Sequence, residues 1–198
     1  SDLWYYDLQA SSWQEVVLPG DKPMARYGHT ATLLDDGSVL ILGGVNADGD
    51  PLNDFWRYDP LGNTFTRLTD SNRSHYHHTA TLDRQNGRLV VPGPFNIDSY
   101  SLISESWSFS FTALPLTGMH SAADGLNESG KIVIFLFGGL DNYGNKSDKV
   151  YELDINTLAL TQRPDSMPHP VANGASARLL IDQGAGGVTG RSNGGSEL

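Results

Sequence analysis

The chain repeats a small set of landmarks along its 198 residues. Four pairs of large apolar side chains, each seven positions apart, recur, and the second members of consecutive pairs are 52, 42 and 53 residues apart. A period of about 40–50 residues is typical of folds in which one small unit stacks on its neighbours. The pairs are Tyr6 and Trp13, Tyr58 and Phe65, Tyr100 and Trp107, and an aliphatic counterpart, Leu153 and Leu160.

Two further landmarks return in phase with these pairs. A histidine opens a short β-prone run in three of the repeats, and a hydrophobic run then leads to a diglycine or a remnant of one, whose second glycine lies 15, 15 or 19 residues after the histidine. A single four-stranded sheet cannot bury both faces until neighbours stack on it, so this pattern predicts an all-β propeller. The histidines are His29, His78 and His120, and a faded fourth copy lies at 173–176.

These landmarks resemble the kelch repeat, in which a diglycine is followed by a spaced Tyr and Trp and is often preceded by Arg and His. The best match begins with Arg26-Tyr27-Gly28-His29, continues through Gly43-Gly44 and ends with Tyr58-Asp59 and Phe65. The resemblance implies a β-propeller built of four-stranded antiparallel blades. We expect Phe55–Asp59 and residues 150–154 to form the third strand of their blades.

The repeats amount to about four blade equivalents, which we interpret as part of a larger propeller. Two alternatives stay open: residues 3–13 could pair with residues 175–181 to complete a fourth blade, or a partner could supply the missing edges. The expected divisions are a half blade at 1–25, blades at 26–70, 71–114 and 115–165, a partial blade at 166–182, and a Gly/Ser-rich tail or linker at 183–198.

Composition excludes several classes of function. The formal net charge of -10 argues against binding the phosphate backbone of a nucleic acid, which needs clustered Lys and Arg. Because the chain has no cysteine, it can form neither disulfides nor thiolate metal sites. No apolar run approaches the roughly 20 residues that span a bilayer.

Three Asn-X-Ser triplets bear on the compartment. They begin at Asn72, Asn127 and Asn145, all in expected loops, as glycosylation acceptors should. The sequons favour an extracellular or cell-surface setting, with the cytoplasm as the alternative.

Variation between repeats falls in loops, and loops carry recognition. In the kelch family, the loops between strands two and three lie on the same side as those between strand four and the next blade, which here include residues 71–77 and 165–171. The resemblance therefore implies ligand contacts at Arg26, Tyr27, Arg73, His75, Tyr76, Asn142 and Tyr143.

Several alternative sites are weaker on the sequence alone. The run from His75 to His78 contains imidazoles that suit zinc or copper, but no third ligand follows nearby. The histidines of the repeat are better explained by structural hydrogen bonds, and Asp48-Gly49-Asp50 by a solvated turn. We assign no catalytic residue, metal or cofactor.

The function that we expect is non-catalytic: a recognition module that binds a protein or a glycan through the loops of one propeller face. The alternative is part of a carbohydrate-active or oxidase-like propeller enzyme, because galactose oxidase shares this type of repeat. Its copper site uses a tyrosine–cysteine crosslink, which a chain without cysteine cannot form. A third hypothesis is a structural or adhesive component that self-associates through exposed blade edges.

Overall fold

The structure is a computed structural model that describes residues 2–94, 96–112 and 114–174; the expected tail at 183–198 lies outside these ranges. The chain divides into two compact units. Unit 1 comprises residues 1–77 and 104–107, and unit 2 comprises residues 78–103 and 108–198. The described ranges contain 14 β-strands and no helix, so the expected all-β class is confirmed.

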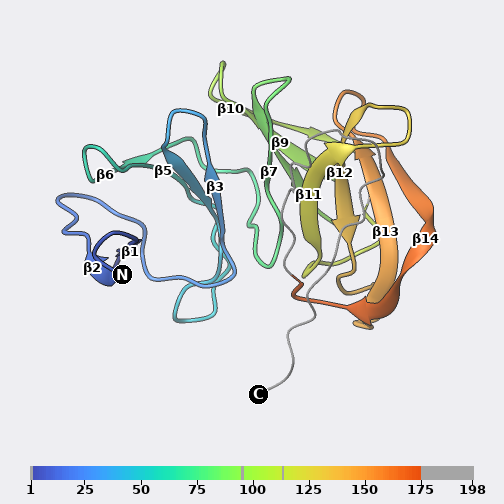
Figure 1. Ribbon diagram of the computed structural model, residues 1–198, viewed down its shortest axis with the longest axis horizontal. Coiled ribbons are helices and arrows are strands. Elements are labelled where there is room, and N and C mark those ends of the chain that lie inside the picture. Colours follow the sequence, from blue (N-terminus) through green and yellow to red (C-terminus); the bar gives the residue numbers. More distant parts are fainter. Residues whose placement is uncertain (1, 95, 113, 175–198) are drawn as a thin grey trace. The chain divides into compact units, whose positions relative to one another are not determined.

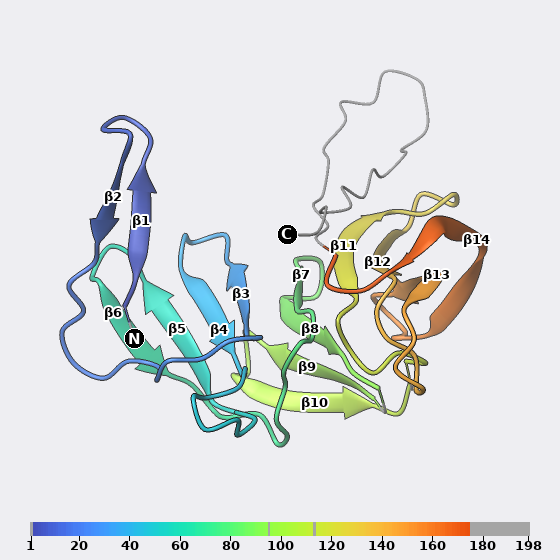
Figure 2. The same cartoon turned by 90° about the horizontal axis from the view of Figure 1, so that it is seen from below.

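Unit 1 contains a two-stranded hairpin and one complete blade (Figures 1 and 2). The four strands of the blade are hydrogen-bonded in chain order and antiparallel, as in the predicted kelch blade. The third strand has the predicted bounds. The hairpin strands are β1 (Trp4–Asp7) and β2 (Ser12–Glu15), and the blade strands are β3 (Thr30–Leu33), β4 (Val39–Leu42), β5 (Phe55–Asp59) and β6 (Thr64–Arg67).

Unit 2 contains two further four-stranded sheets, again with neighbours in chain order. Residues 104–107, at the start of β10, group with unit 1. One sheet has β7 (Thr81–Asp83), β8 (Arg88–Pro92), β9 (Ile97–Ser101) and β10 (Ser106–Ser110). The other has β11 (Ser121–Leu126), β12 (Ile132–Phe137), β13 (Ser147–Asp154) and β14 (Leu160–Val171).

The pairing of strands three and four explains the seven-residue spacing of the apolar pairs. In the blade of unit 1, Tyr58 lies directly opposite Phe65, with ring centroids 4.9 Å apart. Tyr6 and Trp13 are opposite in the hairpin, and so are Leu153 and Leu160 in unit 2. These three pairs are thus cross-strand contacts that close their hairpins and fix the register. The hairpin of β1 and β2 repeats the register of strands three and four of a blade, which supports the expected half blade at 1–25.

Each unit has its own apolar core. Leu40, Leu42, Phe55 and Trp56 are buried in unit 1, on the two central strands of its blade. In unit 2 one cluster joins the two sheets, and its burial supplies the main stabilising free energy. The cluster comprises Val90, Ile97, Leu114, Leu116, Ile134, Leu136, Tyr151, Leu153, Ile155 and Leu158.

The diglycines stand where two backbones approach each other closely. In unit 1 the amide of Gly44 donates a 2.7 Å hydrogen bond to the carbonyl oxygen of His75, and a Cβ on Gly43 would overlap that same oxygen. A Cβ on Gly44 would lie 2.8 Å from the carbonyl oxygen of Tyr27. Both glycines have positive φ, 62° and 100°, which also favours glycine.

Unit 2 builds the same junction from other residues. Gly138 and Gly139 have φ of 63° and 98°, and the amide of Gly139 donates to the carbonyl oxygen of Val171 at 2.8 Å. A Cβ on Gly138 would lie 2.5 Å from that oxygen. In both units the diglycine therefore allows a close passage of two backbones that a side chain would block.

Two expectations at the end of the described chain are wrong. Residues 165–171 were expected in a loop, but β14 continues through them to Val171, with shifts in its register against β13. Asn173 was aligned with the repeat histidine. Its amide, however, donates to the carbonyl oxygen of Met119, and in unit 1 the amide of His77 donates to the carbonyl oxygen of Gly28 in the same way. Asn173 therefore matches His77, one residue before the repeat histidine. The blade divisions themselves stay a prediction.

The diglycine junction predicts a large difference between two glycines of unit 1. Gly43→Ala should lower the free energy of unfolding by more than about 3 kcal/mol, because the new Cβ displaces the backbone at His75. Gly49→Ala is the matched control, since Gly49 also has positive φ but a Cβ there meets nothing within 4 Å, so it should cost about 1–2 kcal/mol. Urea unfolding measures both; equal losses would contradict the role of the junction.

Candidate functional site

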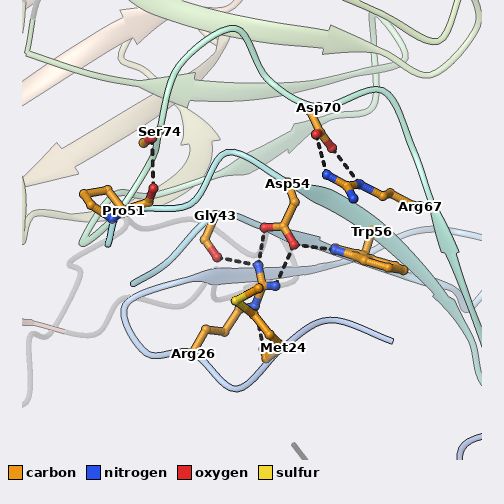
Figure 3. A network of polar contacts seen from close by, with 9 residues as sticks. All are labelled: Met24, Arg26, Gly43, Pro51, Asp54, Trp56, Arg67, Asp70 and Ser74. Carbon is orange, nitrogen blue, oxygen red and sulfur yellow. Dashed lines mark hydrogen bonds and ion pairs between the residues drawn. The ribbon is translucent and has the colours of Figure 1, made fainter. Parts of the chain in front are cut away.

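A buried ion pair lies at the base of the loops of unit 1 (Figure 3). The guanidinium of Arg26 donates to both carboxylate oxygens of Asp54, at 2.5 and 2.7 Å, and to the carbonyl oxygen of Gly43 at 2.9 Å. The side chains are only 4% and 13% exposed. Trp56 donates from Nε1 to Asp54 at 2.6 Å, so the carboxylate receives bonds from two side chains.

These bonds control the ionisation of Asp54. Burial by itself raises its pKa, but the hydrogen bonds from Arg26 and Trp56 and the charge of Arg26 outweigh burial and hold the pKa below its ordinary value. The network continues outward, because the guanidinium of Arg67 lies 5.8 Å from the ring centre of Trp56 and pairs with Asp70. Arg26 and Asp54 thus form a charged pair that is hydrogen-bonded to other groups of unit 1, namely Gly43 and Trp56.

The pair is particular to this blade. In each blade the glycine that follows strand two donates its amide to a carbonyl oxygen at or near the start of strand three, and that carbonyl belongs to Asp54, Asn96 and Lys149 in turn. Gly93 therefore corresponds to Gly43, and its alignment with the second glycine of the repeat was wrong. By the same alignment His75 and Thr117 stand where Arg26 does. Since the other two blades form without the ion pair, Arg26 and Asp54 are not a requirement of the blade fold.

His75, one of the expected ligand contacts, is buried in unit 1. Its Nε2 is hydrogen-bonded to Oγ of Ser71 at 2.9 Å, and its ring stacks on Trp107 with centroids 6.1 Å apart. Burial, assisted by the charge of Arg73, lowers the pKa of His75 to about 4. The imidazole is therefore neutral near pH 7 and forms part of the interior.

Three neighbouring aromatic side chains form an exposed surface on unit 1, which we call the aromatic surface: Tyr27, Tyr76 and His77. The ring of His77 neighbours both tyrosines, with centroids 6.1 Å from Tyr27 and 5.9 Å from Tyr76. Tyr27 is 57% exposed and Tyr76 is 50% exposed. The imidazole of His77 also packs over Gly28, where a Cβ would come within 3.1 Å of it.

The loop at residues 46–50 adjoins the aromatic surface. Tyr27 and Val45 exchange both backbone hydrogen bonds, at 3.0 and 2.8 Å, and Val45 also bridges to Pro51, so the loop begins and ends beside Tyr27. The side chain of Asn46 accepts from the amides of Asp48 and Asp50, which fixes the turn. The loop is therefore the expected solvated turn, and it presents the exposed carboxylates of Asp48 and Asp50 on an ordered backbone.

Unit 2 has an equivalent loop at residues 141–145. Asp141 accepts from the amides of Tyr143 and Asn145, both at 2.8 Å, in the place of Asn46. Tyr143, at the tip, is 90% exposed, and Asn142 beside it is exposed as well. The two expected contact residues in this loop thus stand on the surface of unit 2.

The expected contacts therefore differ in their surroundings. Tyr27, Arg73 and Tyr76 are at the surface of unit 1, whereas Arg26 and His75 point inward. Sequence reasoning missed Asp54 and His77. His77 could have been found from the repeat, because it precedes His78 as Gly28 precedes His29. In the structure both residues have positive φ.

The repeat histidines were considered as metal ligands because imidazoles suit zinc or copper. In the described ranges, no three His, Cys, Asp or Glu side chains gather as ligands. His120 is buried in unit 2, hydrogen-bonded through Nε2 to Thr79 Oγ1 at 2.9 Å, and burial lowers its pKa to about 4. This contact agrees with the structural role that was expected of the histidine.

Comparison with known proteins identifies the family. The sequence model of the KLHDC2/KLHL20/DRC7 Kelch-repeats domain matches residues 1–127, more than half of the chain. The chain belongs to this kelch-repeat family. The predicted resemblance is thereby confirmed, and the sheets of both units are kelch blades.

Relatives of this kelch chain cover part of its length. Kelch domain-containing protein 1 of Homo sapiens is 32% identical over 96 residues, which are 47% of this chain and 24% of that protein. The tRNA wybutosine-synthesizing protein 4 of Aspergillus fumigatus is 28% identical over 106 residues, 46% of this chain and 10% of that protein. The chain thus spans about a quarter of the first relative and a tenth of the second.

A solved structure supports the fold of the kelch chain. The structure of YjhT superposes with a TM-score of 0.68 over 89% of this chain and 63% of that chain, at 18% identity. This likeness concerns the fold alone. The described part of the kelch chain includes no helix that could cross a membrane.

The buried pair predicts a strong effect of charge removal. Asp54→Asn keeps the shape of the side chain but leaves Arg26 buried without its counter-ion, so the free energy of unfolding should fall by about 3–5 kcal/mol. Asp70→Asn is the control, because the Arg67–Asp70 pair is more exposed and should contribute less than about 1 kcal/mol. Urea unfolding at pH 7 distinguishes the two; similar losses would argue against a buried pair.

Proposed function

We propose that the chain is a non-catalytic recognition module that binds a protein partner through the aromatic surface of unit 1. One observation carries the proposal. The same backbone junction exists in unit 2, where the amide of Asn173 bonds to Met119 as His77 bonds to Gly28, but the tyrosine positions hold Gly118 and Ala172. The fold therefore does not need aromatic side chains here.

Exposed aromatic rings held on an ordered backbone are typical of binding surfaces. Tyrosine supplies a large contact area with little loss of conformational entropy, and it is enriched among residues that dominate binding energy. On Tyr27 both backbone polar groups are engaged with Val45, and the amide of His77 is engaged with Gly28. These engaged backbone groups are not available to orient a sugar, which supports a protein over a glycan as the ligand.

The enzyme alternative rests on relatives. One relative has the name tRNA wybutosine-synthesizing protein 4, so kelch repeats occur in a protein named for a synthesis. Against this role, four polar side chains in the interior of unit 1 are bonded to one another: Arg26 to Asp54, and His75 to Ser71. We therefore place recognition first.

Self-association is a second candidate function. It is supported by the hairpin of unit 1, whose Trp4, Tyr5, Tyr6 and Trp13 are exposed, whereas Trp56 at the position equivalent to Trp4 is buried. Unpaired strand edges with apolar side chains attract other strands. Sedimentation velocity distinguishes the candidates, because association predicts a mass that rises with concentration.

Selection of peptides tests the recognition function. Peptides selected from a random phage-displayed library on the purified chain should lose affinity about tenfold or more in Tyr27→Ala and in Tyr76→Ala, because both rings are contacts. Leu61→Ala, at an exposed turn of the same unit, is the control and should change affinity less than about twofold. If no selected peptide distinguishes the tyrosine variants from the parent, the aromatic surface is not the site.

The extracellular setting leads to a separate proposal on the sequons. Asn127 donates from Nδ2 to Glu152 at 2.7 Å and accepts two backbone amides, so a glycan there would break an existing contact. Asn72 and Asn145 are exposed, and the bond that Asn145 donates from Nδ2 to Asp141 is longer, at 3.2 Å, and lies at the surface. We expect that in a secretory host Asn72→Gln and Asn145→Gln each remove one glycan, whereas Asn127→Gln removes none. Intact mass before and after deglycosylation measures this, and an unglycosylated secreted protein would contradict it.

A further inference from the structure

The charge of the chain is concentrated in the unit that carries the aromatic surface. Unit 1 contains five Lys and Arg residues against twelve Asp and Glu residues, a formal net charge of -7. Unit 2 contains eight against eleven, a net charge of -3. Several cations of unit 1 are paired with its own carboxylates: Arg26 with Asp54, Arg57 with Asp36, and Arg67 with Asp70.

Part of this negative charge adjoins the aromatic surface. The loop at 46–50 carries Asp48 and Asp50, both exposed, and its first end pairs with Tyr27 through Val45. At its other end Ser74 donates to the carbonyl oxygen of Pro51 at 3.2 Å, which ties the loop to the segment that leads into Tyr76 (Figure 3). The acidic loop is therefore anchored to both segments that supply the tyrosines.

Aromatic faces next to carboxylates favour one kind of ligand. The face of a tyrosine ring attracts a cation within about 6 Å, and the attraction adds to that of nearby negative charges. A guanidinium can stack on a ring while it bonds to a carboxylate, and its long stem covers apolar surface. An acidic ligand would be repelled by Asp48 and Asp50. The adjoining segment offers Arg73 as its cation.

We propose that the aromatic surface binds a basic peptide segment of a protein partner, with an Arg or Lys side chain over Tyr27 and Tyr76 and with Asp48 and Asp50 as counter-charges. The inference rests on the proposed recognition function and specifies its partner. The negative field of unit 1 steers such a segment toward the surface, so association weakens as salt increases.

A defined peptide tests the charge of the ligand. The probe is a fluorescein-labelled octapeptide of alternating Gly and Arg, with a Gly/Glu octapeptide as its counterpart, and fluorescence anisotropy measures binding to the full chain. The arginine peptide should bind, and raising NaCl from about 50 to about 300 mM should weaken its binding about tenfold. No binding of the arginine peptide, or tighter binding of the glutamate peptide, would overturn the inference.

Charge variants locate the interaction. Asp48→Asn with Asp50→Asn should weaken binding of the arginine peptide about fivefold, and Arg73→Ala should strengthen it about threefold, because one removes attraction and the other repulsion. Asp141→Asn is the matched control: it removes a carboxylate from the equivalent loop of unit 2 and installs the amide that Asn46 has. It should leave binding unchanged. Weaker binding in Arg73→Ala would overturn the inference.

The tyrosine variants separate this inference from the proposed function. If Tyr27→Ala weakens peptides selected from the library but the arginine peptide does not bind, recognition stands and the basic partner is wrong. If the arginine peptide binds and the tyrosine and aspartate variants do not affect it, the peptide binds elsewhere and the basic-partner inference is wrong, whereas the recognition function is still decided by the library-selected peptides. Circular dichroism and the melting temperature of each variant confirm that it remains folded.

Discussion

The close passage of two backbones at each diglycine is the constraint on which the rest of the structure depends. In unit 1 the carbonyl oxygen of His75 accepts a hydrogen bond from the amide of Gly44. A Cβ on the neighbouring Gly43 would overlap that oxygen. This bond fixes where the segment at 71–77 lies relative to the blade. The buried contact of His75 with Ser71 and the exposed position of Tyr76 both follow from it.

The two units show which side chains this backbone requires. Positive φ and a diglycine recur in both, with Val171 in place of His75. The aromatic side chains and the Arg26–Asp54 pair do not recur, so they are additions to a common scaffold. Buried additions stabilise the loops of unit 1, and exposed ones are available to a partner. Differences between repeats that share one backbone are therefore a physical guide to function.

Much of the fold followed from the spacing of a few residues. Seven positions between Tyr58 and Phe65 correspond to a hairpin in which they face each other, and Phe55–Asp59 forms the strand that was predicted. The alignment failed where the landmarks fade. Asn173 was aligned one position too far along the repeat, and residues 165–171 continue β14 although three prolines interrupt it, which an edge strand tolerates.

The sequence by itself determined the kelch repeat, the four-stranded blades and the places of the two complete diglycines, because these depend on local pairing and on the absence of a Cβ. Only the tertiary structure decided which of the expected contact residues face outward. Arg26 and Tyr27 are adjacent in sequence, yet one is buried against Asp54 and the other is exposed beside His77. Exposure depends on residues distant in the chain, since Asp54 and His77 reach this place only through strand pairing and the hydrogen bond of His77 to Gly28.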